Sequence, residues 1–246
     1  MTQRKNVLIT GTNRGLGRAF VEEFAKKGFN VIAHARLQNE EHECHLKKIS
    51  EQNGVDITPV YFDLLDKDSL KDNIQNLIKS KTKIDVLVNS AGIAHGGYFQ
   101  MTKMTTIRDV FEINFFAQLE LTQLLLRWMT RNGGGSIINL ASNAGIDLSA
   151  GNCAYGVSKA AIIAFTKTLA AEYAMTKVRV NAVAPGLTDT QMADLMDEKS
   201  QNKMLDKTTQ KRRATPKEIA DTVIFLASDE SSFVNGQIIR IDGGLE

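Results

Sequence analysis

The chain has 246 residues, of which 24% are charged and 43% are hydrophobic, and its formal net charge is +2. This length fits one α/β domain with a filled core, and so small a charge predicts neither a nucleic-acid partner nor binding to an anionic membrane. The sequence has no run of about 18 apolar residues, so we expect no transmembrane helix. It leads from Met1 into a strand without room for a signal peptide, and its two cysteines, Cys44 and Cys153, are too few for a disulfide framework. We therefore expect a cytoplasmic protein.

Apolar runs of strand length alternate with helical patterns along the whole chain. The predicted strands cover residues 6–10, 30–35, 57–62, 84–89, 135–141, 178–184 and 237–241. The predicted helices cover residues 15–27, 40–52, 67–80, 104–130, 153–175 and 216–227. Strands that are apolar on both faces and separated by helices predict a single domain with a Rossmann-type, doubly wound, seven-stranded parallel sheet. We expect ligands at the carboxyl edge of this sheet, near the point where the strand order switches.

A glycine-rich turn joins the first predicted strand to the first predicted helix. Gly11, Gly15 and Gly17 have the spacing G-x-x-x-G-x-G, and the sequence strand, glycine turn, helix is the context that a dinucleotide site requires. Gly11 permits the tight turn, while Gly15 and Gly17 let backbone amides and the helix N-terminus approach a pyrophosphate. The turn is not a P-loop, because no Gly-Lys-Ser/Thr closes it.

The end of the second predicted strand indicates which dinucleotide is bound. A carboxylate at this place would bind the ribose 2′-hydroxyl of NAD, but the first acid is Glu40. Arg36 stands there instead, and Arg14 lies inside the glycine turn. Two guanidinium groups could grip a 2′-phosphate, whereas the alternative is that both are solvated surface arginines. We therefore expect NADP(H) as the cofactor.

The run His42-Glu43-Cys44-His45 superficially resembles a metal site. It lies on a charged helix without a second pair of ligands, so we interpret it as a solvated face and expect no metal. All four histidines fall within the first 95 residues, so a hydrolase triad built on Ser142 would lack a downstream histidine, and no G-x-S-x-G motif occurs.

Tyr155 and Lys159 stand four residues apart and therefore share one face of the predicted helix 153–175. Lys159 would favour the phenolate of Tyr155, whose pKa is ordinarily about 10, and so bring it toward neutrality. The phenol could then exchange a proton with an alcohol or carbonyl oxygen that Ser142 holds in place. An ordinary amphipathic pair is the alternative, but the dinucleotide turn favours the catalytic interpretation.

The segment 187–213 is polar, lacks glycine and carries Met192, Met196 and Met204 at roughly helical spacing. It is either a surface helix pair or a mobile lid whose methionines touch substrate.

These motifs together resemble the short-chain dehydrogenase/reductase family, in its β-ketoacyl-ACP reductase-like branch, over almost the whole chain. The resemblance rests on Thr10-Gly11-x-x-x-Gly15-x-Gly17, Asp63, Asn89-Ser90-Ala91-Gly92, Asn114, Ser142, Tyr155-x-x-x-Lys159, Pro185-Gly186 and Ile241-Asp242-Gly243-Gly244. It implies NADPH-dependent reduction of a carbonyl, with Asn114, Ser142, Tyr155 and Lys159 as the catalytic residues. It also favours the lid for segment 187–213.

The same resemblance implies the cofactor-binding residues and some of their roles. They are Gly11, Asn13, Arg14, Gly15, Leu16, Gly17, Arg36, Asp63, Leu64, Asn89, Ala91, Gly92, Tyr155, Lys159, Pro185, Gly186, Thr188 and Thr190. Asp63 would accept from the adenine amino group, and Asn89 would stabilise the sheet and line the adenine-ribose pocket. The backbone of Asn114 would hold a water in a proton relay through Lys159.

Substrate and partners stay open at this point. The resemblance implies a 3-oxoacyl thioester, while a sugar, polyol or other small ketone, and a non-catalytic dinucleotide sensor, are the alternatives. Arg127, Arg131 and Lys167 could meet an acidic acyl carrier protein (ACP) near the site mouth, but Ala171 stands where the branch commonly has arginine. The family packs the helices predicted at 104–130 and 153–175 between subunits, which implies a homotetramer.

Overall fold

The computed structural model describes residues 4–245, and residues 1–3, where we expect no signal peptide, lie outside the described part. Seven parallel strands form one sheet in the order β3-β2-β1-β4-β5-β6-β7. The strands are β1 (Asn6–Thr10), β2 (Asn30–Ala35), β3 (Ile57–Tyr61), β4 (Val86–Asn89), β5 (Gly135–Leu140), β6 (Val178–Pro185) and β7 (Ile238–Ile241). The predicted doubly wound fold is confirmed, and the strand order switches between β1 and β4.

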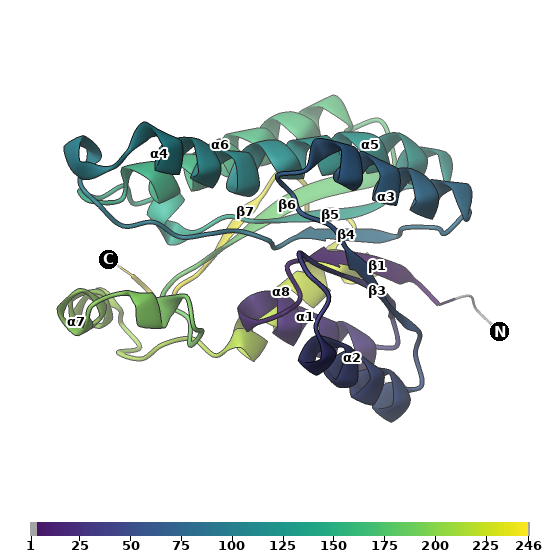
Figure 1. Ribbon diagram of the computed structural model, residues 1–246, viewed down its shortest axis with the longest axis horizontal. Coiled ribbons are helices and arrows are strands. Elements are labelled where there is room, and N and C mark those ends of the chain that lie inside the picture. The colour runs from purple at the N-terminus through teal and green to yellow at the C-terminus, as the bar shows by residue number, and fades with distance from the viewer. Residues whose placement is uncertain (1–3, 246) are drawn as a thin grey trace.

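Helices cover both faces of the sheet (Figure 1). One layer contains α1 (Gly15–Lys26), α2 (Glu40–Asn53) and α8 (Pro216–Ala227), and the other contains α3 (Lys67–Lys79), α4 (Met104–Phe111), α5 (Ala117–Arg131) and α6 (Cys153–Glu172). Each layer encloses an apolar core, with Phe20 and Phe24 of α1 in the first and Leu121 and Leu125 of α5 in the second. Burial of these side chains is the main force that holds each layer to the sheet.

The ends of two helices illustrate how local sequence sets them. Thr215 and Glu218 form a reciprocal capping box, and Pro216 occupies the first helical position of α8, so the predicted range 216–227 is confirmed. The helix predicted at 153–175 ends earlier, at Glu172. Apart from the helix predicted at 104–130, the other predicted helices and strands are recovered with ends shifted by at most two residues.

The helix predicted over 104–130 is not uniform. A π-helical segment, Glu112–Phe116, separates α4 from α5. In this segment the amide of Ala117 donates to the carbonyl of Glu112, five residues back. Such π segments insert an extra residue into a helix and often occur at functional sites.

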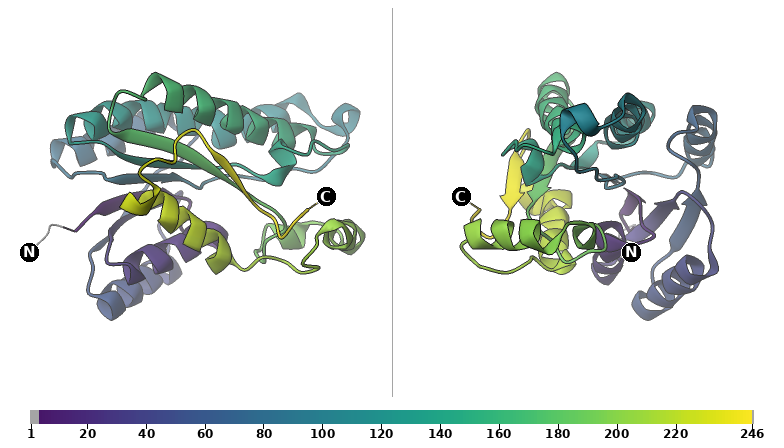
Figure 2. Two further views of the ribbon diagram at one scale, coloured as in Figure 1. Left: turned by 180° about the vertical axis from the view of Figure 1, so that it is seen from behind. Right: turned by 60° about the vertical axis from the view of Figure 1, so that its left-hand side comes forward.

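The segment 187–213 forms a short 3₁₀ turn, η4 (Ala193–Leu195), and the helix α7 (Glu198–Lys207). Figure 1 and the left view of Figure 2 show α7 beyond the end of the helical layers, near the C-terminal end of the chain. The amides of Thr209 and Gln210 donate to the carbonyls of Gly244 and Gly243, at 3.0 and 3.1 Å. The base of the segment is therefore tied to the C-terminal residues, while α7 itself projects with no buried residue among those described.

None of the described helices combines the length and the apolar character that crossing a membrane requires.

Candidate active site at the carboxyl edge of the sheet

Ser142, Tyr155 and Lys159 meet where β5 ends and α6 begins. Lys159 is 2% exposed, and its Nζ donates to the carbonyl oxygen of Leu140, the last residue of β5, at 2.6 Å. The same nitrogen lies 5.8 Å from the centroid of the Tyr155 ring. Ser142 caps a short 3₁₀ turn, and its Oγ accepts from the amide of Ala144 at 3.2 Å. The three side chains are thus brought together as the sequence predicts.

The electrostatics of the pair differ from the expectation. Burial raises the pKa of Tyr155, and a hydrogen bond from Ser142 acts in the opposite direction. Burial also lowers the pKa of Lys159, to about 8. The expectation that Lys159 lowers the phenol pKa toward neutrality is therefore wrong for this structure, because burial disfavours charge on both groups and Lys159 directs its hydrogen bond to Leu140.

Asn114 lies in the π-helical segment and is completely buried. Its Oδ1 accepts from the amide of Ile93 at 2.8 Å, and its Nδ2 donates to the carbonyl of Ile93 at 2.9 Å and to Oγ of Ser158 at 3.1 Å. The side chain therefore clamps the loop after β4 to α6. Only the backbone of Asn114 is left for the proton relay that the resemblance implies.

The glycine turn packs directly on the loop after β4. A Cβ on Gly11, whose φ is +74°, would lie 2.9 Å from Cα of Ala91, and a Cβ on Gly17 would lie 2.1 Å from the carbonyl oxygen of Gly11. The Oγ1 of Thr10 accepts from the amides of Ser90 and Ala91, at 2.9 and 3.0 Å. No larger residue fits at Gly11 or Gly17, so the backbone of the turn stays close to the sheet edge and its amides can approach a phosphate.

Gly92 lies between the glycine turn and two of the predicted catalytic residues. A Cβ at Gly92 would lie 3.1 Å from Oδ1 of Asn114 and 3.5 Å from Nζ of Lys159. The residue that follows Ala91 is thus in contact distance of two of the four predicted catalytic residues. The two motifs, more than 100 residues apart in the sequence, form one continuous site at the sheet edge.

Arg14 and Arg36 are both exposed, and neither side chain forms a hydrogen bond or ion pair with the described residues. Asp63 and Leu64 follow β3 at the same edge. Asp63 accepts from the amide of Leu65 at 2.9 Å, while Asp66, not Asp63, caps α3. The two arginine side chains therefore have no partner among the described residues, whereas the Asp63 carboxylate already accepts one backbone hydrogen bond.

Asn89 does not line a pocket with its side chain. It is completely buried, and its Nδ2 donates to Oγ1 of Thr122 at 3.0 Å and to Oδ1 of Asn139 at 2.8 Å. This ties β4 to β5 and α5, so the predicted contribution to the sheet is confirmed. The predicted contact with the adenine-ribose pocket is left to its backbone.

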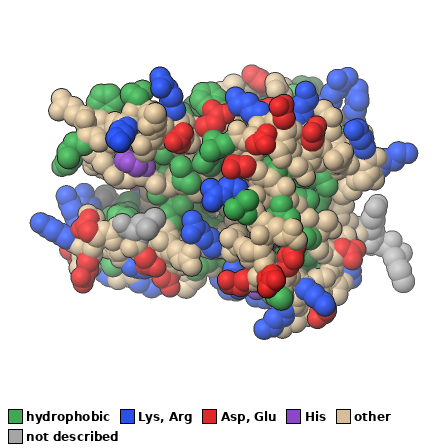
Figure 3. All heavy atoms as spheres, in the orientation of Figure 1, with side chains coloured by type: hydrophobic (Ala, Val, Ile, Leu, Met, Phe, Trp, Pro, Cys, Tyr) green, Lys and Arg blue, Asp and Glu red, His purple; other side chains and the backbone are tan. Residues whose placement is uncertain are grey.

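The loop after β6 closes the site from the other side. The amide of Gly186 donates to the carbonyl of Ile241 at 2.9 Å, and this holds the Pro185-Gly186 turn against β7. The hydroxyl of Thr188 donates to the carbonyl of Gly186 at 3.1 Å. A Cβ on Gly15 would lie 3.8 Å from Cβ of Thr190, so Thr190 stands beside the glycine turn. Figure 3 shows the surface hollowed between the upper helical layer and the segment of α7.

The remaining residues of the predicted cofactor set, Asn13 and Leu16, also lie on the glycine turn. Asn13 is exposed, and its Oδ1 accepts from Nδ2 of Asn39 at 3.1 Å, whereas Leu16 is half-buried against α1's own apolar core.

Two histidines that the sequence analysis did not place at the site lie beneath the glycine turn. His34 on β2 and His42 on α2 are 2% and 3% exposed. The interpretation of 42–45 as a solvated face is therefore wrong for His42, although Cys44 is exposed. The described residues include no group of three or more His, Cys, Asp or Glu arranged around a metal position. A histidine inside the apolar run Val31–Ala35 was the available signal, because a buried imidazole requires partners.

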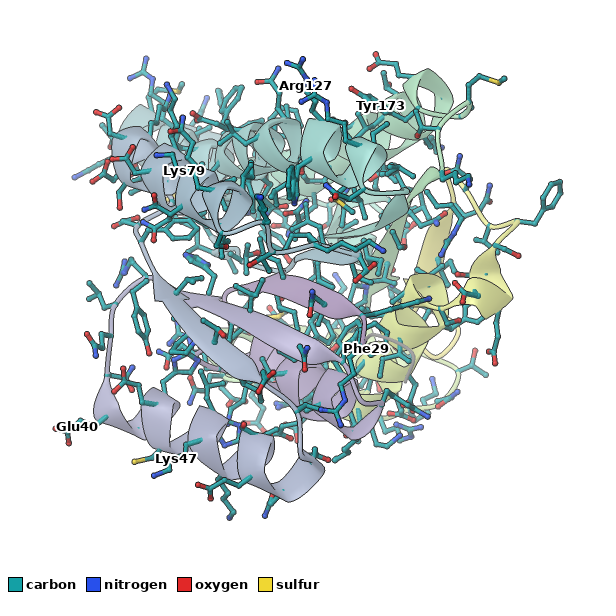
Figure 4. All side chains as sticks on the ribbon, turned by 90° about the vertical axis from the view of Figure 1, so that its right-hand side faces the viewer. Phe29, Glu40, Lys47, Lys79, Arg127 and Tyr173 are labelled. Atoms are coloured by element: carbon teal, nitrogen blue, oxygen red, sulfur yellow. The ribbon has the colours of Figure 1, made fainter. Side chains whose placement is uncertain are left out.

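The basic residues considered for an acidic carrier protein do not surround the site of their own chain. Lys167 stands 12 residues after Tyr155 on α6, which is about 18 Å along the helix axis. Arg127 and Arg131 lie near the end of α5, and Figure 4, which faces the end of the molecule opposite to α7, shows Arg127 and Tyr173 on the outer helices. The expectation that these cations lie near the site mouth is wrong within one chain.

Known proteins resemble the chain along nearly its whole length. The family model described as Enoyl-(Acyl carrier protein) reductase matches residues 11–246. The 3-oxoacyl-[acyl-carrier-protein] reductase FabG of Thermotoga maritima is 37% identical over 241 residues, which are 98% of this chain and 97% of the relative. FabG of Aquifex aeolicus is 33% identical over 243 residues, which are 99% of this chain and 98% of the relative.

Solved structures give the same result. The 3-oxoacyl-[acyl-carrier protein] reductase of Brucella melitensis has a TM-score of 0.89 and 31% identity, covering 99% of this chain and 91% of that one. A proposed gluconate dehydrogenase from Agrobacterium tumefaciens has a TM-score of 0.92 and 28% identity, covering 98% and 95%. The likeness spans both the glycine turn and the Tyr155-Lys159 helix.

Proposed function

The chain belongs to the short-chain dehydrogenase/reductase family of oxidoreductases, and we propose that it reduces the ketone of a 3-oxoacyl thioester to an alcohol with NADPH. The observation that carries the proposal is the position of Gly92. It lies between the glycine turn and the pair of Asn114 and Lys159, so that a dinucleotide on the turn would end beside the catalytic residues.

The residues at the sheet edge are suited to hold NADPH. Backbone amides of the glycine turn would bind the pyrophosphate, and Arg14 and Arg36 would bind the 2′-phosphate in bidentate fashion. Lys159 would bind the nicotinamide ribose, and Thr188 and Thr190 the carboxamide or the pyrophosphate. When bound, the nicotinamide supplies the hydride.

The chain itself supplies orientation and the proton. Ser142 and Tyr155 would hydrogen-bond the substrate carbonyl oxygen, on which negative charge develops during reduction. Tyr155 then donates its proton to that oxygen, and the ammonium of Lys159 stabilises the phenolate that remains. A water on the backbone of Asn114 would return a proton through Lys159. Preorganised donors at a developing oxyanion are typically the largest contribution to such catalysis.

Apolar side chains beyond the carboxyl edge favour an acyl substrate. Tyr98, Phe99 and Met101 in the loop after β4 are 66%, 61% and 83% exposed, and Leu148 in the loop after β5 is 64% exposed. The two loops are joined by a hydrogen bond from the amide of Gly97 to the carbonyl of Gly151 at 2.7 Å. Exposed apolar groups gathered on joined loops indicate a binding surface, and an acyl chain would cover them where a sugar would not.

A sugar, polyol or other small ketone is the second candidate. The similarity to the proposed gluconate dehydrogenase of Agrobacterium tumefaciens favours it. So does Ala171, which is exposed where a carrier-dependent reductase of this branch commonly has arginine.

The proposal includes a homotetramer in the cytoplasm. Phe116 and Val157 on the outer surface of the α5 and α6 layer are 50% and 42% exposed, which suits packing against a second copy. Cys44 and Cys153 are both free thiols, as expected in a reducing compartment.

Turnover measurements test the proposed reaction. NADPH oxidation is followed with acetoacetyl thioesters, diketones and keto-sugars, and Tyr155→Phe serves as the matched control. We expect the thioesters to give the highest kcat/KM and the control to lose most of its activity on every substrate. A higher kcat/KM for keto-sugars would favour the second candidate. Binding of NADPH without turnover of any of these carbonyls would contradict the proposed enzymatic activity and support a non-catalytic dinucleotide sensor.

A further inference from the structure

The glycine turn rests on two buried histidines that the proposed reaction does not use. His34 lies near the end of β2, and His42 lies in the first turn of α2. Both belong to the stretch that leads from the end of β2, through Arg36, into α2. His34 contacts the backbone of the turn and His42 contacts one of its side chains, so the hydrogen bonds of the two histidines help to position the turn.

His34 links three strands at their carboxyl ends. The amide of Gly11 donates to its Nδ1 at 3.3 Å, so the proton of the neutral ring is on Nε2, which donates to the carbonyl of Phe62 at 2.9 Å. The pKa of His34 is lowered to about 4, mainly by burial. The ring therefore stays neutral, and its Nδ1 remains a hydrogen-bond acceptor. The first glycine of the turn is thereby held to β2 and β3.

His42 links the turn to α2. The hydroxyl of Thr12 donates to the carbonyl of His34 at 3.0 Å, so its oxygen is free to accept from Nε2 of His42, also at 3.0 Å. Asn39 makes a second connection: its Oδ1 accepts from the amide of His42 at 2.8 Å, and its Nδ2 donates to Oδ1 of Asn13 at 3.1 Å. Thr12 and Asn13 are therefore tied to the start of α2 by two hydrogen bonds.

This connection lies between the two arginines assigned to the 2′-phosphate. Arg14 directly follows Asn13, and Arg36 precedes Asn39 by three residues. A two-armed phosphate grip requires both arms to start from fixed positions, because mobile guanidinium groups lose conformational entropy when they bind.

We propose that His42, acting through Thr12, is a positioning residue that sets the separation of Arg14 and Arg36 and so determines the preference for NADPH over NADH. The inference rests on the proposed use of NADPH. In this proposal the arginines contact the phosphate, and His42 sets where they lie. The His42 imidazole itself touches neither the phosphate nor the reacting atoms.

Equilibrium binding of NADPH and NADH, measured by calorimetry, tests the proposal without requiring turnover. His42→Leu removes the donor to Thr12 and keeps an apolar side chain in the buried position. His42→Gln keeps an N–H donor near the position of Nε2 and is the matched control. We expect His42→Leu to raise the Kd of NADPH by about five- to tenfold, which corresponds to about 1.0–1.4 kcal/mol and lies within the range of one neutral hydrogen bond. The Kd of NADH should change by less than about twofold, and His42→Gln should resemble the wild type.

The two proposals fail in different ways. Equal affinity of the wild type for NADPH and NADH overturns the use of a 2′-phosphate and this inference with it. A wild-type preference that His42→Leu leaves intact, or an equal loss of affinity for both cofactors, overturns only the role of His42. Should His42→Leu not fold, Thr12→Val removes the acceptor from the other side and is judged by the same ratio of dissociation constants.

Discussion

The Nζ of Lys159 lies 5.8 Å from the ring centroid of Tyr155 and donates its hydrogen bond to the carbonyl of Leu140 at 2.6 Å. The cation is thus fixed by the end of β5, at a distance from the phenol at which it can stabilise a phenolate once one forms. Since burial raises the pKa of Tyr155, the phenol keeps its proton until an oxyanion requires it. This arrangement suits a proton donor in the direction of carbonyl reduction.

Removing the phenol proton alone tests this assignment. Tyr155→Phe keeps the ring and its packing but removes the acid, so we expect kcat to fall by about 10²- to 10⁴-fold. The Kd of NADPH should stay nearly unchanged, because the ring still fills its place. Stopped-flow turnover and binding titration measure the two quantities separately. Retention of most of the activity would show that another group donates the proton.

Lys159→Met should impair both steps. Methionine fills a similar volume but supplies neither the charge that stabilises the phenolate nor a donor for the nicotinamide ribose. We expect kcat to fall and the Kd of NADPH to rise together, in contrast to Tyr155→Phe. A variant with reduced kcat and unchanged NADPH affinity would contradict the proposed contact with the ribose.

Charge reversal at Arg36 addresses the choice of cofactor. Arg36→Asp removes one arm of the phosphate grip and adds a repelling carboxylate, which could also accept from a ribose hydroxyl. A charge-assisted hydrogen bond contributes about 1.5–3 kcal/mol, so NADPH affinity should fall by about 10- to 150-fold. NADH affinity should be spared, and the ratio of the two dissociation constants measures the effect.

His34 should make the stability of the protein depend on pH. In the folded chain its pKa is lowered to about 4, mainly by burial, whereas in the unfolded chain it is near the ordinary 6.5. Between these values the unfolded chain binds more protons, so the contribution of the neutral ring is complete above pH 6.5 and is lost as the pH falls toward 4. The loss amounts to about 3 kcal/mol. Denaturant unfolding of the wild type and of His34→Gln at a series of pH values measures the contribution of His34 to the free energy of unfolding. Parallel pH profiles of the two proteins would contradict the neutral, buried state of His34.

The positions of the basic residues bear on whether the substrate is delivered by a carrier protein. Because Ala171 replaces the usual arginine, and because Arg127, Arg131 and Lys167 lie away from Tyr155 within one chain, we expect little advantage of an acyl-ACP over a simple acetoacetyl thioester. The kcat/KM should also depend little on salt. A strong ACP preference that disappears as salt is added would instead show that these cations form a docking surface, and would favour a role in fatty-acid elongation.

The sequence predicted the sheet and the placement of Tyr155 beside Lys159 because both depend on local patterns. Alternating strands and helices determine a doubly wound sheet, and a spacing of four residues places Tyr155 and Lys159 on one helix face. Neither feature depends on contacts between residues that are distant in the sequence, so both can be predicted from local patterns.

Features that depend on tertiary contacts were beyond the sequence. The direction of the Tyr155 pKa shift follows from burial, which spacing does not reveal. The charged residues around His42 in the sequence indicated an exposed side chain. Its burial could not be predicted, because its partner Thr12 lies 30 residues earlier in the chain. Likewise, the run Glu112–Phe116 has no sequence signal that distinguishes a π-helical segment from ordinary helix, and the partner of Asn114, Ile93, lies 21 residues earlier in the chain.

That π-helical segment also changes how one helical rod meets its neighbours. An extra residue in a helix rotates everything after it by about 100° relative to an uninterrupted α-helix. Before the segment, α4 packs against α6, and after it α5 packs against α3 on the other side. The phase shift at Asn114 therefore lets a single rod contact two neighbours in the outer layer, and the residue that clamps the loop after β4 to α6 also marks the point where the packing partner changes.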